Sequence, residues 1–290
     1  MTQLTPFYDK VQAIYDNEHS TDFVSLFLDP TMLYSTAYFD RQDMTLEEAQ
    51  IAKLDLALGK CDLHPGQRLL DVGCGWGAGA LRAAQKHKVH VTALTLSKSQ
   101  WDFVTQKVKQ LPPGSGTVDV RLQGWEEFEE SVDRIISVAA FEHFRRERHA
   151  AFFERCRKIL PDDGCMLLHT IVWFSIHKVE DWGLPVDFEH VQFAKFIRKE
   201  IFPGGELADP DIIAGHAENA GFTVTRQHSL RPHYARTLDI WAANLEKNRQ
   251  AALAMTSQKV YDRFMRYLTG CAKYFRSGHI DVTQFSLKCR

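Results

Sequence analysis

The sequence predicts an α/β protein built on a doubly wound, mostly parallel sheet. Between residues 69 and 172, apolar segments rich in β-branched residues alternate with segments of helical periodicity. The first apolar segment, residues 69–72, runs directly into a glycine-rich loop and then a helix. Because parallel strands present their carboxyl ends at one edge of such a sheet, we expect a ligand site at that edge.

The glycine-rich loop indicates the kind of ligand. It combines an acid, Asp71, with three alternating glycines, Gly73, Gly75 and Gly77. Glycine permits a tight turn and a close approach of the backbone to a ligand. The spacing differs from the G-x-G-x-x-G of dinucleotide-binding proteins, and no Gly-Lys-Ser/Thr follows as in a P-loop. The loop therefore favours a different adenosine-bearing ligand over a purely structural turn.

The elements after the loop alternate as a doubly wound sheet requires. We expect helices at residues 78–88, 98–110 and 148–160, and strands at residues 89–96, 118–122, 134–138 and 165–172. Proline and glycine break the chain at residues 112–116 and again at 161–164. These breaks separate helix from strand.

The second half departs from this alternation. Residues 173–203 interrupt the sheet pattern and carry apolar side chains at helical intervals, namely Phe188, Val191, Phe193, Phe196 and Ile197. We expect a helical lid that shapes a substrate pocket, although the same spacing suits a helix packed on its own core. Residues 222–225 and 281–287 read as closing strands at an antiparallel edge, with helices at 238–253 and 257–275 between them.

Composition limits the class of protein. The chain has 290 residues, 44% of them hydrophobic, which is typical of a globular enzyme. A net charge of −2 argues against nucleic-acid binding. The sequence shows neither a membrane-length apolar run nor a secretory signal at residues 1–6. The six cysteines lack C-x-x-C spacing, which predicts a reducing cytoplasm and no metal site.

Over nearly its whole length the chain resembles a known family. The resemblance is carried by the glycine loop and by blocks at residues 34–39, 46–50, 94–100, 123–126, 140–144, 168–170, 200–205, 233–241 and 267–271. The chain is similar to the cyclopropane-fatty-acid synthase and mycolic acid methyltransferase group of S-adenosylmethionine-dependent methyltransferases, and most similar to the mycobacterial mycolic acid type. This implies one domain, residues 1–290, with the Rossmann-like class I methyltransferase fold. Residues 1–60 would form a helical cap over the cofactor, and residues 173–203 a lid or substrate-binding insertion.

The resemblance implies a set of residues that bind S-adenosyl-L-methionine. Backbone donors at Gly73 and Gly75 would face the cofactor, and Asp71 would orient the loop or meet the methionine ammonium. The other positions, which would hold ribose and adenine or close over the cofactor, are Thr95, Leu96, Gln100, Trp125, Glu126, Tyr34 and Ser35. An aromatic face at Trp125 suits stacking on adenine, and the Glu126 carboxylate suits its amino group.

The acceptor that the resemblance implies is a double bond in an unsaturated long acyl chain. An alkene does not need to lose a proton before it attacks the methyl donor. The alkene carbon attacks the sulfonium methyl group, and a carbocation remains on the chain. Loss of a proton then closes a cyclopropane ring; other outcomes are a methyl-branched alkene or, after addition of water, a hydroxyl. An acyl carrier protein is a candidate for presenting the chain.

In the family, the base is attributed to a bound bicarbonate. The corresponding positions here are Thr36, Val138, Glu142, His169 and Tyr234, and Thr36 stands where the family usually has cysteine. Taken alone, a histidine on an apolar strand is more often a core residue, but its block favours the site for His169. Cys271 lies in a block typical of the family and is a further candidate, although a buried thiol is the simpler interpretation.

Two other functions stay open at this point. One is an N- or O-methyltransferase of a small nucleophile, which would need a lone pair on the acceptor and a base. The other is a catalytically impaired homologue that only binds the cofactor. Thr36 and the segment at residues 15–23, longer and more polar than its counterpart in the family, suggest the second alternative.

Overall fold

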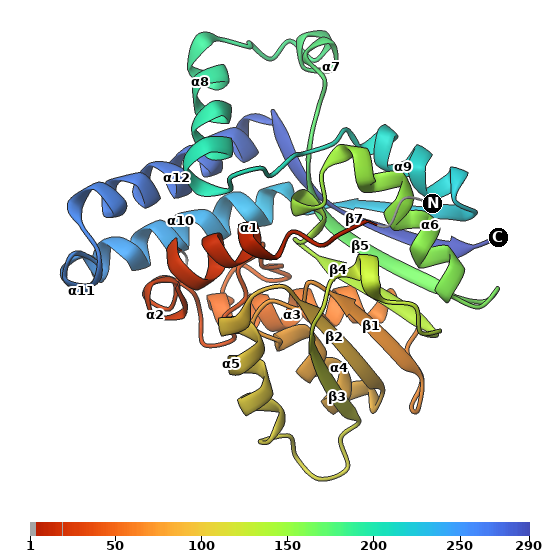
Figure 1. Ribbon diagram of the computed structural model, residues 1–290. Coiled ribbons are helices and arrows are strands. Elements are labelled where there is room, and N and C mark those ends of the chain that lie inside the picture. The colour runs from red at the N-terminus through yellow and green to blue at the C-terminus, as the bar shows by residue number, and fades with distance from the viewer. Residues whose placement is uncertain (1–3, 19) are drawn as a thin grey trace.

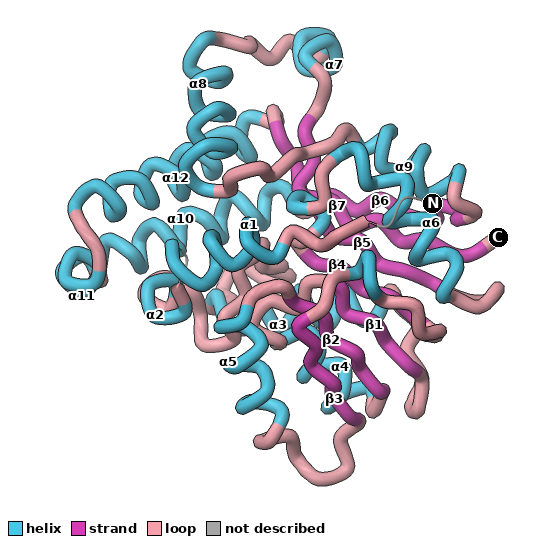
Figure 2. Tube along the Cα trace, viewed as in Figure 1, coloured by secondary structure: helices cyan, strands magenta, loops and turns pink. Residues whose placement is uncertain are grey.

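A mixed sheet runs through the centre of the molecule, with helices on both faces (Figures 1 and 2). The computed structural model describes residues 4–18 and 20–290, so residues 1–3 and His19, which belong to segments discussed above, lie outside it. Within the described residues seven strands form one sheet in the order β3-β2-β1-β4-β5-β7-β6. They are β1 (Arg68–Val72), β2 (His90–Thr95), β3 (Thr117–Leu122), β4 (Arg134–Val138), β5 (Cys165–Trp173), β6 (Phe222–Ser229) and β7 (Ile280–Cys289).

The strand directions confirm the predicted doubly wound sheet. Strands β1 to β5 pair in parallel, and β7 is antiparallel to both of its neighbours, β5 and β6. The antiparallel strand therefore lies one place inside the edge, which β6 forms. From β1 the chain first builds outward through β2 and β3 and then returns to start β4 on the other side of β1. Such a reversal opens a crevice at the carboxyl ends of β1 and β4.

In chain order the helices are α1 (Tyr8–Gln12), η1 (Ala13–Glu18), α2 (Thr21–Val24), α3 (Leu46–Gly59), α4 (Ala78–His87), α5 (Lys98–Val108), η2 (Trp125–Glu127), η3 (Phe141–His143), η4 (Arg146–Arg148), α6 (His149–Ile159), α7 (Ile176–Asp181), α8 (Phe188–Phe196), η5 (Ile197–Ile201), α9 (Pro210–Asn219), α10 (Arg231–Lys247), α11 (Arg249–Met255) and α12 (Gln258–Ser277). The predicted helices at residues 78–88, 98–110, 148–160 and 257–275 are present as α4, α5, α6 and α12, and the structure adds others, among them α9. None of these helices, all drawn from the described residues, has the length and apolar character needed to cross a membrane.

Alternation along the strands sends side chains to different cores. Leu69 packs with α3 and α4 on one face, whereas its neighbour Leu70 packs with α6 and α9 on the other. Apolar residues at successive positions of β1 are thus explained by burial on both faces, as expected for a parallel strand. A third cluster joins α10 and α12 to α2 and α8.

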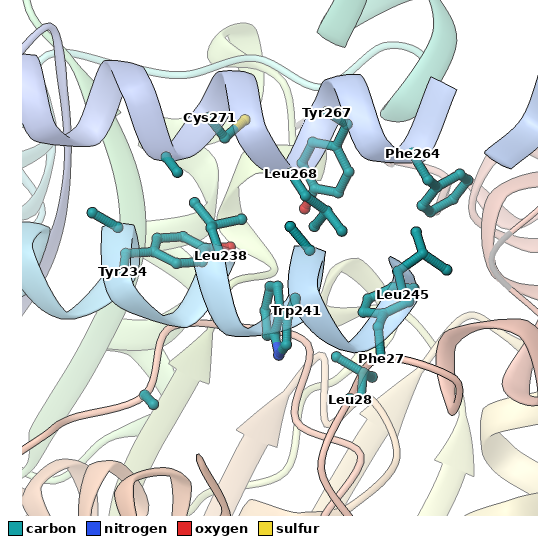
Figure 3. Packing of buried hydrophobic residues seen from close by; sticks show 14 of the residues in the cluster. Phe27, Leu28, Tyr234, Leu238, Trp241, Leu245, Phe264, Tyr267, Leu268 and Cys271 are labelled. Atoms are coloured by element: carbon teal, nitrogen blue, oxygen red, sulfur yellow. The ribbon is translucent and has the colours of Figure 1, made fainter. Parts of the chain in front are cut away.

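Figure 3 shows the α10–α12 part of this third cluster, where Leu238 and Leu245 of α10 face Leu268 and Phe264 of α12. Trp241 of α10 points to the other side, toward Phe27. The sequence predicts a single helix at residues 238–253, but the structure has two helices there, α10 and α11, which divide at Asn248. The first of them begins earlier, at Arg231, and Pro232 is tolerated there because it lies in the first turn.

The segment at residues 173–203 is helical, as expected. It contains α7, α8 and η5, which stand apart from the sheet at the top of Figure 1. Its apolar residues are divided between two environments. Phe193 and Phe196 are buried in the third cluster, while Phe188 is 76% exposed. One side of α8 therefore packs on the protein, and the other does not.

Candidate active site

The loop between β1 and α4 is held against β2. The N–H groups of Gly73 and Cys74 both donate to the carbonyl oxygen of Leu94, at 3.1 and 2.9 Å. Gly73, Gly75 and Gly77 have positive φ angles of 81°, 55° and 82°, which glycine adopts without strain. The positive φ angles of this loop thus explain why glycine occurs at all three alternate positions.

The three glycines differ in what surrounds them. A Cβ on Gly73 would lie 2.4 Å from the Cβ of Ala140, and one on Gly77 would lie 2.6 Å from a methyl group of Val104. A Cβ on Gly75 would meet no atom within 4 Å. Gly73 and Gly77 therefore allow elements to pack, whereas Gly75 faces open space beside the cavity that it lines.

That cavity lies at the carboxyl ends of β1 and β4 and extends past the ends of β2 and β3. All ten residues predicted to bind the cofactor line it: Tyr34, Ser35, Asp71, Gly73, Gly75, Thr95, Leu96, Gln100, Trp125 and Glu126. Phe7, Val11 and Tyr15, from the N-terminal helices, also line it. Residues far apart in the chain therefore meet at the crevice that the strand order opens.

Two neighbouring residues show how one end of the cavity is built. Trp125 is buried and makes an edge-on contact with Phe152, with ring centroids 5.3 Å apart. Oε1 of Glu126 accepts from Nη1 of Arg148 at 3.1 Å, while Oε2 is buried without a hydrogen-bond partner among the described residues. Burial raises the pKa of the Glu126 carboxyl despite the nearby Arg148. Oε2 of Glu126 therefore lacks a hydrogen-bond donor, which a bound ligand could supply.

The N-terminal segment is tied to the start of α5. The carboxylate of Asp16 accepts from the hydroxyl of Ser99 at 2.8 Å and from that of Ser97. The side chain of Gln12 donates to the carbonyl oxygen of Leu96 at 3.1 Å. Asp16, one of the polar residues that set residues 15–23 apart in the sequence, thus attaches this segment to the start of α5.

A buried lysine that the sequence analysis missed lies behind the cavity wall. Lys53 of α3 is fully buried, and its Nζ donates to Oγ of Ser35 at 2.9 Å. Burial lowers the pKa of Lys53 to about 7. Burial also raises the pKa of Asp71 to about 7, against the opposing effect of the charge on Lys53. The burial of Lys53 could have been predicted from helical periodicity, because Lys53 lies on the same buried face of α3 as Ala49 and Ala57.

Three of the predicted catalytic residues lie at the end of β4, just beyond it, and in the middle of the neighbouring strand β5. Val138 is paired in register with His169, and the N–H of Ala139 donates to the carbonyl oxygen of His169 at 2.8 Å. Glu142 follows β4 in η3, and its Oε1 accepts from the N–H of Ile171 at 2.7 Å. Burial raises the pKa of Glu142 to about 7. Burial lowers the pKa of His169 well below its usual value.

Glu142 and His169 each keep one polar atom free. Oε2 of Glu142 and Nε2 of His169 are buried and have no hydrogen-bond partner within residues 4–18 and 20–290. A buried polar atom without a partner is costly and calls for a ligand or water. Glu142 is attached to β5 two residues beyond His169, through its contact with Ile171, so both unpaired atoms belong to this part of the sheet.

Tyr234 and Cys271 come from facing helices, α10 and α12 (Figure 3). Burial raises the pKa of Tyr234 well above its usual value, and neighbouring Cys271, Tyr34 and Glu142 raise it further. These groups therefore lie close enough to interact. Burial raises the pKa of the Cys271 thiol as well, so the sulfur stays protonated and is a poor nucleophile.

Thr36 is buried, and its hydroxyl donates to the carbonyl oxygen of Ala37 at 2.9 Å. The next residue ties this segment to α10, since the N–H of Ala37 donates to Oγ1 of Thr237 at 3.0 Å. Of the six predicted catalytic residues, Val138 alone is among the described residues that line the cavity. The other five lie in the buried protein beside it.

Comparison with known proteins identifies the family to which this fold and site correspond. The family model described as "Mycolic acid cyclopropane synthetase" matches residues 2–285. Cyclopropane mycolic acid synthase MmaA2 of Mycobacterium tuberculosis is 53% identical over 99% of both chains, and cyclopropane mycolic acid synthase 1 of the same species is 54% identical over 98% of both.

Solved structures give the same result. The structure of MmaA2 from Mycobacterium tuberculosis matches with a TM-score of 0.95 over 99% of both chains at 53% identity. The structure of CmaA1 complexed with SAH and CTAB matches with a TM-score of 0.94, at 54% identity, over 98% of this chain and 99% of that one. A coclaurine N-methyltransferase, 24% identical with a TM-score of 0.80 over 99% of this chain and 84% of its own, shares the fold.

The buried position of Lys53 near Asp71 predicts that the pKa of Asp71 will change when Lys53 is replaced. The variant Lys53→Met removes a positive charge that lowers the pKa of Asp71, so that pKa should rise above about 7. Titration of the side-chain carboxyl by ¹³C NMR measures it. Lys259→Met, at an exposed position, is the matched control. An unchanged pKa of Asp71 in Lys53→Met would show that the two groups do not interact.

Proposed function

The chain belongs to the mycolic acid cyclopropane synthetase family, and we propose that it transfers a methyl group from S-adenosyl-L-methionine to the double bond of an unsaturated long acyl chain. The product is a cyclopropane or a methyl-branched chain. The observation that carries this proposal is the placement of the ten predicted cofactor residues around one cavity, beside the buried pair Glu142 and His169.

The cavity fits the proposed cofactor in its chemistry. Asp71 would meet the ammonium group of the methionine part, and Gln100 the ribose. Trp125 offers a face for adenine, and the unpaired Oε2 of Glu126 suits the exocyclic amino group as its donor. The relative CmaA1, solved with SAH, supports this assignment. Residues 1–60 act as the cap, since Phe7, Val11 and Tyr15 line the same cavity.

When bound, the cofactor supplies an electrophilic methyl group. The protein must then exclude water and manage the positive charge left on the acyl chain. Aromatic side chains near the site suit that charge: Tyr34 lies against Trp241 with centroids 5.5 Å apart, and Phe202 lies against Tyr267 at 5.7 Å. An electron-rich, buried surface of this kind stabilises a cation without trapping it covalently.

We propose that a bicarbonate ion is held by Glu142, His169 and Tyr234 and provides the base. The unpaired Oε2 of Glu142 and Nε2 of His169 support this, because a small oxyanion would satisfy both. A carboxyl whose pKa is near 7 is protonated often enough at neutral pH to donate to such an ion. The hydroxyl of Tyr234, held neutral by burial, is a third donor.

The segment at residues 173–203 is the proposed substrate-binding insertion. A cavity of about 790 Å³ opens beside it and is lined by Trp173, Phe174, Val179 and Val191 as well as by Lys195, Arg198 and Lys199. The apolar side suits an acyl chain. The three cations suit an acidic carrier, so an acyl carrier protein is the proposed partner.

Expression in a host that makes cis-monounsaturated acyl chains tests this function. We expect chromatography and mass spectrometry of the host lipids to show acyl chains that have gained one methylene group. A matched host expressing Gly75→Val should lack them. Unchanged lipids in both hosts would count against acyl-chain methylation.

The cofactor assignment predicts the behaviour of the purified Gly75→Val protein. The added side chain would enter the open space at Gly75 and would also be strained at a φ of 55°. Calorimetry with S-adenosylhomocysteine should show loss of binding, with circular dichroism confirming that the variant folds. Undiminished affinity would place the cofactor elsewhere.

The assignment of the base predicts that Glu142→Gln slows turnover by roughly a hundredfold to ten-thousandfold, the range for loss of one positioned acid–base group. Cofactor affinity should be largely unchanged, because Glu142 does not line the cofactor cavity. Release of S-adenosylhomocysteine in the presence of the unsaturated acyl substrate measures the rate. Near-normal turnover would remove this mechanism and favour methylation of a small nucleophile.

A further inference from the structure

A row of three polar side chains crosses the sheet at His169. His169 of β5 is paired in register with Gln284 of β7, and Gln284 is paired with His228 of β6. Side chains of directly paired residues lie on the same face of a sheet. Lys60, the residue that follows α3, contacts this row: its Nζ lies 2.5 Å from Oε1 of Gln284 and 2.9 Å from Nδ1 of His228.

Lys60 determines the orientation of the Gln284 amide. Burial lowers the pKa of Lys60 to about 8, so at neutral pH its amine is mostly an ammonium group. An ammonium group donates hydrogen bonds and accepts none, so the amide atom that faces it is the oxygen. The amide nitrogen is then turned toward His169, where it lies 3.1 Å from Nδ1. Because an amide nitrogen only donates, Nδ1 of His169 must accept and carries no proton.

The remaining ring nitrogen of His169 is therefore the protonated one. Burial, together with the charges of Lys53 and Lys60, lowers the pKa of His169 well below its usual value, so the ring is neutral. A neutral imidazole carries one proton, and here that proton belongs on Nε2. Nε2 is buried and has no acceptor among the described residues.

We infer that Gln284 and Lys60 are positioning residues that hold His169 as the neutral tautomer protonated at Nε2. The inference rests on the proposed function, in which His169 binds an oxyanion. An N–H donor at Nε2 can donate to any of the acceptor oxygens of such an ion. The other tautomer would present a lone pair, which only the single O–H group of bicarbonate could match, so the hydrogen-bonded row determines how His169 binds the ion.

The variant Gln284→Glu tests this with almost no change in shape. Its carboxylate has no hydrogen to donate, so it should draw a proton onto Nδ1 of His169. The ¹⁵N shifts of the ring, assigned with His169→Asn, distinguish a bare nitrogen from a protonated one. Turnover of the unsaturated acyl substrate should fall by about tenfold or more, by analogy with the loss of a partner that orients a metal-binding histidine. Cofactor affinity should not change.

Two further variants complete the test. Lys60→Met leaves the amide free to turn, so His169 should show both tautomers and an intermediate rate. Gln227→Glu makes the same chemical change at an exposed position of β6 and should alter neither the ring nor the rate. If Gln284→Glu fails to fold, the wild-type ring and Lys60→Met still decide the matter.

The outcomes separate this inference from the proposed function. A proton on Nδ1 of His169 in the wild-type protein would overturn the inference, and so would a Gln284→Glu protein with unaltered ring and rate. Absence of turnover by the wild-type protein would count against the proposed function. The NMR measurement would then still establish whether Gln284 and Lys60 set the tautomer.

Discussion

The close approach of two loops at the switch point is the constraint on which the site depends. The loop after β1 passes the turn after β4 so tightly that a Cβ on Gly73 would lie 2.4 Å from that of Ala140. Ala139, at the same turn, has a positive φ of 54°, which is uncommon for alanine. This approach brings the cofactor loop next to Val138 and Glu142. Methyl donor and base can therefore share one edge of the sheet.

Burial of ionisable groups gives the site its electrostatic character. Asp71 and Glu142 both have a pKa raised to about 7 by burial, while burial lowers the pKa of Lys53 to about 7. Groups near their midpoint at neutral pH can change protonation at small energetic cost when a charged ligand arrives. The positive charge in this site is first on the sulfonium of the methyl donor and then on the acyl chain. Ionisable groups that can gain or lose a proton near pH 7 can stabilise the charge in both positions, whereas groups of fixed charge would be matched to only one of them.

Local sequence patterns were sufficient for the parallel part of the sheet and for the glycine loop, because periodicity and glycine placement act over a few residues. The other cofactor residues that line the cavity were implied by the family resemblance. The local patterns placed β4 at residues 134–138 and the glycine loop at the correct edge. They could not show that β7 inserts between β5 and β6, since that pairing is non-local. Gln284 and Lys60 were missed for the same reason: each gains its role only when β7 and the end of α3 meet His169. Lys53 could have been found, as its position on a buried helical stripe was visible.

The geometry at Thr36 bears on whether the chain is an impaired homologue. Its hydroxyl is directed to the carbonyl oxygen of Ala37, within the buried backbone, and the segment is held to α10 through Thr237. A cysteine thiol is a weaker donor than a hydroxyl, so threonine holds this turn at least as well. If the oxyanion is bound through the main chain of residue 36, replacing sulfur by a hydroxyl leaves that contact in place. The departure from the family pattern at Thr36 therefore gives little reason to expect loss of catalysis, and the arrangement of Glu142, His169 and Tyr234 carries more weight.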